Sequence, residues 1–63
     1  MNKYTFEIEV RDNESGNTWM TTDFAVAENE KQALINVDED NDRLGYKIIR
    51  ATIIAVEPFD DDE

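Results

Sequence analysis

The amino-acid sequence predicts an α+β domain with the element order ββαβ, a three-stranded antiparallel sheet with one helix packed on one face. Two segments that alternate apolar and polar residues come first, separated by turn-forming residues. The periodicity then changes to that of a helix, and a segment rich in β-branched residues follows. A helical crossover places the third strand beside the first, so we expect the sheet order 2-1-3.

The length of the chain limits the architecture to one small domain. It has 63 residues, of which 16 are acidic and 6 are basic, for a formal net charge of -10. A domain of this size buries only about 60% of the surface that its unfolded chain exposes, so its core is small. We expect a single ββαβ domain over residues 1–58 and a disordered acidic tail over residues 59–63.

The first two strands form a predicted hairpin over residues 3–11 and 18–27, joined by a loop rich in Asp, Asn, Ser and Gly. The apolar residues of the first strand share one face: Tyr4, Phe6, Ile8 and Val10. A register that keeps the apolar residues of both strands together sets Phe6 opposite Phe24. One face of the hairpin is therefore expected to join the core.

The other face of this hairpin gathers acidic residues. The same register sets Glu7 opposite Asp23, with Glu9 beside them. Like charges that face each other across two strands destabilise the pair. Because folding alone does not favour this arrangement, we interpret Glu7, Glu9 and Asp23 as candidates for contact with a partner.

The helix is predicted to begin at Asn29, because Asn29 and Gln32 have the spacing of a capping box. Gly45 can supply the left-handed residue that follows a helix. Four carboxylates stand where this helix should end: Asp38, Glu39, Asp40 and Asp42. The helix macrodipole favours cations there, by roughly 0.3 to 1 kcal/mol for each exposed charge. The acidic run opposes helix stability and is a second candidate for partner contact.

The third strand is predicted over residues 46–57, and its isoleucines do not keep to one face. Ile48 and Ile54 share one parity, whereas Ile49 and Ile53 share the other. This pattern predicts either a β-bulge or a second apolar surface that a partner covers.

Trp19 allows two interpretations. The predicted register turns it outward next to Arg11, where a tryptophan is typical of an interface. A bulge in the second strand would instead turn Trp19 toward the edge of the core and leave Met20 outside.

The residue types argue against catalysis and metal binding. The chain has no cysteine and no histidine, so it lacks the common zinc ligands and the usual proton shuttle at neutral pH. Asp38, Asp40 and Asp42 have the spacing that begins a calcium loop. However, Arg43 stands where that loop needs glycine and Ile49 where it needs glutamate. We expect no enzymatic activity, no metal and no cofactor.

The charge of the chain indicates the kind of partner. A net charge of -10 opposes direct binding to DNA or RNA, whose phosphates attract Lys and Arg. It fits a domain whose carboxylates take the place of phosphates on a basic, nucleic-acid-binding protein. No signal segment or membrane-spanning run is visible. We therefore expect a cytoplasmic monomer or homodimer that does not bind membranes.

Two segments resemble small proteins encoded by phages and mobile elements. The chain opens with KYTFEIEV, residues 3–10, and FAVAENEKQAL, residues 24–34, runs from a strand through alanine into a capped helix. The acidic members of this group resemble anti-CRISPR, anti-restriction and uracil-DNA glycosylase inhibitors, which take the place of DNA on a host protein. The resemblance implies a nucleic-acid mimic that inhibits a host defence or repair protein, and it does not choose among these targets. Our leading hypothesis names a CRISPR nuclease.

The residues expected to contact the partner are those whose positions folding does not explain, together with the outward-facing tryptophan: Glu7, Glu9, Trp19, Asp23, Asp38, Glu39, Asp40 and Asp42. An alternative is a phage accessory module that inhibits nothing and binds through an apolar patch of Ile49, Ile53 and Trp19. Its charge would then serve only solubility. Replacement of these apolar residues would abolish binding by such a module, whereas replacement of the acidic residues would not.

Overall fold

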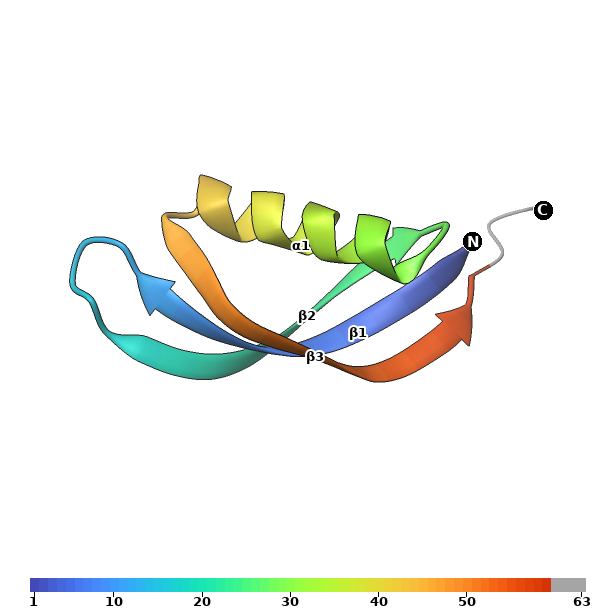
Figure 1. Cartoon of the computed structure of the whole chain (residues 1–63), viewed down its shortest axis with the longest axis horizontal. Helices are drawn as coiled ribbons and strands as arrows, with labels where there is room; N and C mark the ends of the chain where they lie inside the picture. Colours follow the sequence, from blue (N-terminus) through green and yellow to red (C-terminus); the bar gives the residue numbers. More distant parts are fainter. Residues whose placement is uncertain (60–63) are drawn as a thin grey trace.

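The chain folds into a three-stranded antiparallel sheet with one helix lying across one face (Figure 1). This computed structural model describes residues 1–59. The elements are β1 (Asn2–Asp12), β2 (Thr18–Ala27), α1 (Glu30–Arg43) and β3 (Tyr46–Pro58). The sheet order is β2-β1-β3, which confirms the predicted fold class and topology. The tail predicted over residues 59–63 lies, apart from Phe59, outside the described residues.

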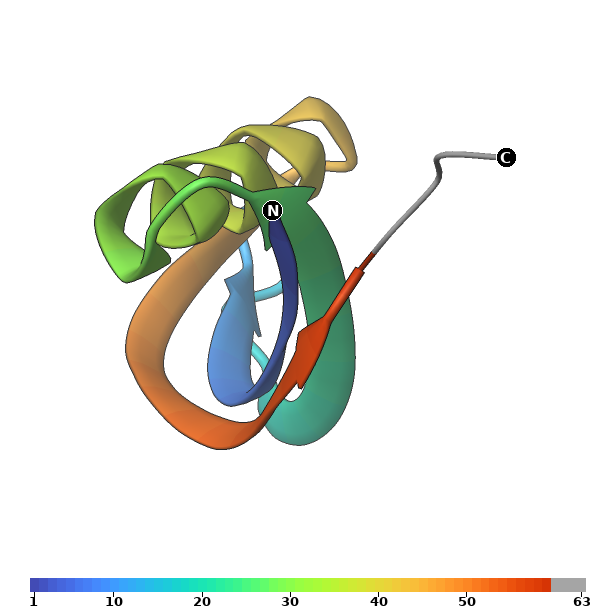
Figure 2. The ribbon, with the colours of Figure 1, turned by 90° about the vertical axis from the view of Figure 1, so that its right-hand side faces the viewer.

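The core lies between α1 and the face of the sheet that curves around it (Figure 1). Figure 2 looks along the molecule and shows β2 and β3 on either side of the central strand β1, with α1 above them. β1 supplies most of the core because its alternate residues all face the helix. The buried apolar residues are Tyr4, Phe6, Ile8, Val10, Ala27, Ala33 and Val37.

Local sequence signals explain both ends of α1. The Asn29 side chain caps the first turn, where its Oδ1 accepts a hydrogen bond from the Gln32 backbone N–H at 2.8 Å. After the helix, Gly45 has a φ of 91°, in the left-handed region that favours glycine. Asn29 and Gly45 thus act as predicted at the two ends, although the Gln32 side chain donates to Asn36 Oδ1 and does not complete the capping box.

The helix continues through the acidic run and ends at Arg43, so the run occupies its last turns, as predicted. The reason is the spacing of the residues that α1 buries, which are Ala33, Val37 and Asn41. Each lies four positions after the last, so they form one stripe that faces the sheet. Asn41 therefore extends the packed face of the helix into the acidic run.

The predicted register of the β1–β2 hairpin is wrong by one residue. Phe6 pairs with Asp23, and Glu7 pairs with Thr22. A shift of one residue moves every side chain of a strand to the opposite face. On β2, the residues that share the helix-covered face with the core residues of β1 are Trp19, Thr21, Asp23, Ala25 and Ala27, and those on the open face are Met20, Thr22, Phe24 and Val26.

Turn geometry and helix packing account for this register. In the hairpin loop, the Asp12 N–H donates to the Asn17 carbonyl at 2.8 Å, and Gly16 takes the left-handed conformation with a φ of 79°. The length of such a loop determines which residues of the two strands pair. The register also puts Ala25 and Ala27 into the core cluster with Ala33, where small side chains allow the helix to approach the sheet.

β3 contains two bulges, so the first of the two explanations offered for its isoleucine pattern applies. The pairing of β1 with β3 shifts between Thr5 and Phe6 and again between Glu9 and Val10. Each shift leaves one residue of β3 without a partner on β1, Ile54 in the first case and Ile49 in the second. The bulges let Ile48 and Ile53 both pack against the core cluster, although they differ in parity.

Candidate interaction surface

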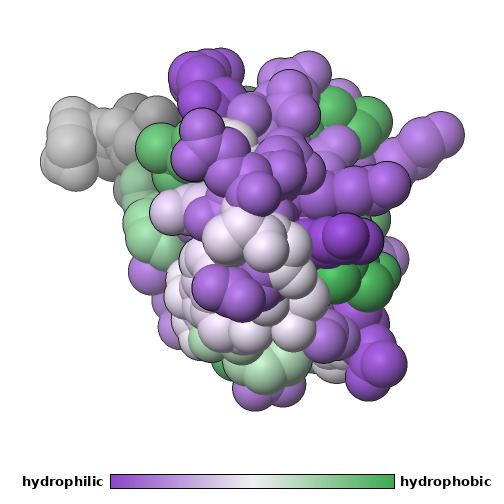
Figure 3. All heavy atoms as spheres, turned by 90° about the vertical axis from the view of Figure 1, so that its left-hand side faces the viewer, coloured by the Kyte–Doolittle hydropathy of each residue, from purple (hydrophilic) through white to green (hydrophobic). Residues whose placement is uncertain are grey.

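Two acidic segments meet at the end of the molecule formed by the hairpin loop and the C-terminal part of α1. The Asn13 backbone N–H donates to the Gly45 carbonyl at 3.0 Å, which ties the hairpin loop to the turn after the helix. Figure 3 views this end and shows hydrophilic side chains over much of its surface. We call its carboxylates the acidic end, which consists of Asp12, Glu14, Asp38, Glu39, Asp40 and Asp42.

Few cations oppose the acidic end. Arg43 Nη1 lies 3.4 Å from Asp40 Oδ1, and both side chains are exposed. An exposed pair of this kind contributes at most about 1 kcal/mol. Within residues 1–59, no Lys or Arg lies at ion-pair distance from the other carboxylates of the acidic end. This end of the molecule therefore carries a concentrated negative charge.

The acidic run of α1 has a linear charge density similar to that of duplex DNA. Residues 38–42 contain four carboxylates in five positions. With a helical rise of about 1.5 Å per residue, they place one charge every ~1.9 Å along the axis. Duplex DNA carries one charge per roughly 1.7 Å. A surface that binds duplex phosphates would therefore meet a comparable density of negative charge on this helix.

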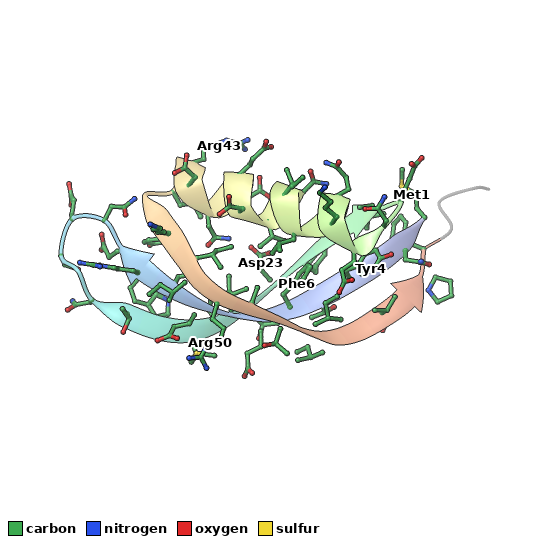
Figure 4. All side chains as sticks on the ribbon, in the orientation of Figure 1. Met1, Tyr4, Phe6, Asp23, Arg43 and Arg50 are labelled. Carbon is green, nitrogen blue, oxygen red and sulfur yellow. The ribbon has the colours of Figure 1, made fainter. Side chains whose placement is uncertain are left out.

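The buried residue of the acidic run, Asn41, connects the helix to β2. Its Nδ2 donates to Asp23 Oδ2 at 3.1 Å and to the Val37 carbonyl at 2.9 Å. The other carboxylate oxygen of Asp23 accepts the Phe24 backbone N–H at 2.8 Å. Figure 4 shows Asp23 between the helix and the sheet. The predicted position of Asp23, outward and opposite Glu7, is thus wrong, because the residue forms an internal polar contact.

Glu7 and Glu9 do lie on the open face of the sheet, but among cations. Glu9 Oε1 is 3.9 Å from Nε of Arg50, and Figure 4 shows Arg50 on the side of the sheet opposite the helix. On β1, Lys3 and Arg11 have the same parity as the two glutamates and face the same side. The structure therefore separates Glu7 and Glu9 from the acidic run of α1.

Trp19 faces the helix-covered side of the sheet. Its ring meets that of Tyr46 edge to face, with the ring centroids 5.1 Å apart, and 38% of the residue stays exposed. This agrees with the interpretation in which Trp19 covers the edge of the core and Met20 points outward. The cause is the register of β2 and not a bulge.

An apolar groove that the sequence did not reveal runs between α1 and β3. It has a volume of about 400 Å³ and is lined by Leu34, Ile35, Asp38, Ile48, Ile49, Arg50 and Ala51. The alternative patch of Ile49, Ile53 and Trp19 does not form, because Ile53 packs against the core and Trp19 against Tyr46. The clue in the sequence was the isoleucine parity, which allowed a bulge or a covered surface but did not indicate which isoleucine would be exposed.

Comparison with known proteins found no matching family model, no similar curated protein and no similar solved structure. In the described part of the chain, no helix has both the length and the apolar character needed to cross a bilayer. Among residues 1–59, no three acidic side chains are grouped so that they could hold a metal ion.

Proposed function

We propose that this chain is an acidic binding protein that occupies the basic, nucleic-acid-binding surface of another protein and thereby blocks access of DNA or RNA to it. The observation that carries the proposal is the acidic run of α1, four exposed carboxylates among residues 38–42 of a helix whose dipole opposes them. Their cost to folding is explained if a cationic partner contacts them.

The way in which the fold holds the acidic run supports this function. Asn41 anchors the run to β2 through Asp23, and the bond from Asn13 to the Gly45 carbonyl holds the hairpin loop beside it. Because the helix already holds the backbone of the run, a partner that binds it has only the exposed side chains left to order. A pre-organised array of carboxylates is what competition with duplex phosphates requires, because phosphates are themselves spaced regularly.

The experiment compares two triple variants of equal net charge. The first, D38N/D40N/D42N, neutralises the acidic run. The second, E28Q/E30Q/E57Q, neutralises three exposed glutamates near the start of α1 and the end of β3, at the opposite end of the molecule. The wild-type chain and both variants are immobilised and used to capture bacterial proteins at low and high NaCl. Each captured protein is identified and tested for displacement by duplex DNA.

The proposal expects a captured nucleic-acid-binding protein that duplex DNA displaces and that high salt releases. D38N/D40N/D42N should weaken its affinity by at least about tenfold, equivalent to 1.4 kcal/mol, whereas E28Q/E30Q/E57Q should change it much less. Equal losses in both variants would mean that only total charge matters, and binding that is insensitive to salt and to DNA would contradict mimicry altogether.

A further inference from the structure

The apolar groove between α1 and β3 is lined by exposed aliphatic side chains from both elements. Leu34 and Ile35 on α1 are 38% and 41% exposed, and Ile49 on β3 is 50% exposed. All three line the same groove. Exposed apolar groups that converge on a hollow, unlike single ones scattered over a surface, are typical of a place where a partner docks.

The second bulge of β3 creates this groove. Ile49 has no pairing partner on β1, because Glu9 pairs with Arg50 and Val10 with Ile48. A bulge aims a side chain away from the regular alternation of a strand. The first bulge does the same to Ile54, which is 55% exposed but does not line the groove. The chain therefore contains two bulged isoleucines of similar exposure, of which one belongs to the groove.

The charged residues around the groove indicate which kind of partner segment it would bind. Asp38 lines the groove itself, and Asp42, one helical turn later, lies on the same side of α1. Arg50 on the β3 side also lines the groove, but its side chain lies on the open face of the sheet, where Nε is 3.9 Å from Glu9 Oε1. An occupant that places an apolar side chain in the groove thus sets its flanking residues against carboxylates, which favours Lys and Arg at those positions.

We propose that the groove binds one aliphatic side chain from a basic segment of a partner protein, while Asp38 and Asp42 of the acidic run pair with cations that flank that side chain toward the C-terminal end of α1. This inference rests on the proposed function and adds to its charge pairs one apolar contact in the groove. Exposed charge pairs mainly raise the rate of association and depend on salt, whereas a buried apolar anchor mainly slows dissociation.

The test uses two short oligolysine peptides, one with a central leucine and one with serine in its place. Their affinities for the wild-type chain, I49S, I35Q and the matched control I54S are measured by fluorescence anisotropy. I49S and I35Q alter the two walls of the groove from different elements, so the test does not depend on the folding of one variant. Circular dichroism confirms the fold of each.

The leucine peptide should bind the wild-type chain and I54S about tenfold more tightly than the serine peptide, because burial of a leucine side chain is worth roughly 1.5 to 3 kcal/mol. That preference should disappear in I49S and I35Q. Equal affinities of the two peptides for the wild-type chain, or a preference that I49S and I54S reduce equally, would overturn the groove proposal.

The same measurements separate this inference from the proposed function. Binding of the serine peptide depends only on charge, so D38N/D40N/D42N should weaken it more than E28Q/E30Q/E57Q does, whatever the groove binds. If that difference holds while the leucine preference is absent, the groove proposal fails and the acidic run remains the binding surface. If the two triple variants bind the serine peptide equally, the acidic run has no special role.

Discussion

Asn41 shows how one residue can serve both folding and the presentation of charge. It is the only buried residue of the acidic run, and its amide donates to Asp23 and to the Val37 carbonyl. A partly buried carboxylate is costly unless a donor satisfies it. The pair therefore holds the last turns of α1 against β2, with the carboxylates of the run directed toward solvent.

Replacement of Asn41 by alanine should lower the free energy of unfolding by about 1 to 3 kcal/mol, because Asp23 Oδ2 loses its donor and only the bond from the Phe24 N–H to Oδ1 remains. Urea denaturation of N41A, D23A and the double variant measures the coupling between the two side chains. The exposed neighbour substitution D42A serves as the control. If N41A were no less stable than D42A, the contact between Asn41 and Asp23 would not matter to the fold.

Gly45 is the second residue with a specific conformational role. A Cβ at this position would meet no atom within 4 Å, so only the φ of 91° disfavours a side chain there. We expect G45A to lose roughly 1 to 2 kcal/mol of stability in thermal or urea unfolding. G45N should lose less, because asparagine tolerates the left-handed conformation better. Equal stability of G45A and the wild type would contradict this assignment.

At the scale of elements, α1 combines a favourable start with an unfavourable end. Asn29 caps its first turn and Glu30 complements the positive end of the macrodipole, but the last turns carry the acidic run. The capped start and the buried stripe of Ala33, Val37 and Asn41 stabilise the helix, and the run weakens it. Replacement of a single anion in the last turns of α1 should therefore stabilise the helix.

The variant D42K should raise the free energy of unfolding by roughly 0.5 to 1.5 kcal/mol, because it replaces an anion with a cation near the negative end of the helix. The variant E30K makes the same charge change in the first turn and should lower stability instead. Urea denaturation at low ionic strength compares them, and high salt should reduce both effects. Changes of the same sign in both variants would mean that net charge, and not the helix dipole, decides the outcome.

The two edge strands also differ from ideal strands in ways that limit pairing with other chains. β2 points the carboxylate of Asp23 inward, and β3 is interrupted by two bulges. Inward charges and bulges both discourage a sheet edge from adding another strand. We therefore place the candidate contacts on the acidic end and the groove, not on the strand edges.

At the scale of the whole molecule, the charges are segregated. The chain has six basic residues, and four of them face the open side of the sheet: Lys3, Arg11, Lys47 and Arg50. Within the described part of the chain, three acidic residues share that face: Glu7, Glu9 and Glu57. The open face is thus nearly balanced, and among residues 1–59 most of the excess negative charge lies at the acidic end.

A chain with a net charge of -10 repels itself in the folded state. We expect its melting temperature to rise as NaCl is added, because salt screens this repulsion. D38N/D40N/D42N should show a higher melting temperature at low salt and a smaller increase with salt. A melting temperature that falls with NaCl would show that attractive ion pairs dominate the electrostatic energy of the fold.

The secondary-structure elements and the acidic run could be predicted from the sequence, but the arrangement of the candidate site could not. Asp38, Glu39, Asp40 and Asp42 could be recognised because they contradict a local rule about helix ends. The contribution of Asp12 and Glu14 to the same surface could not, because it depends on the bond between Asn13 and Gly45. The groove likewise needs two elements distant in sequence, α1 and β3, to come together.

The sequence by itself determined the strands, the capped helix and the sheet order, because alternation, capping and short connections act between near neighbours in the chain. Only the tertiary structure decided the register of β2, and with it whether Asp23 or Phe24 faces the helix. The apolar pattern favoured Phe24, but the hairpin loop and the close approach of the helix to Ala25 and Ala27 favour the other register. A shift of one residue exchanges the two faces of a strand. The register of β2 therefore depends on the hairpin loop and on packing between elements, which the apolar pattern along one strand does not reveal.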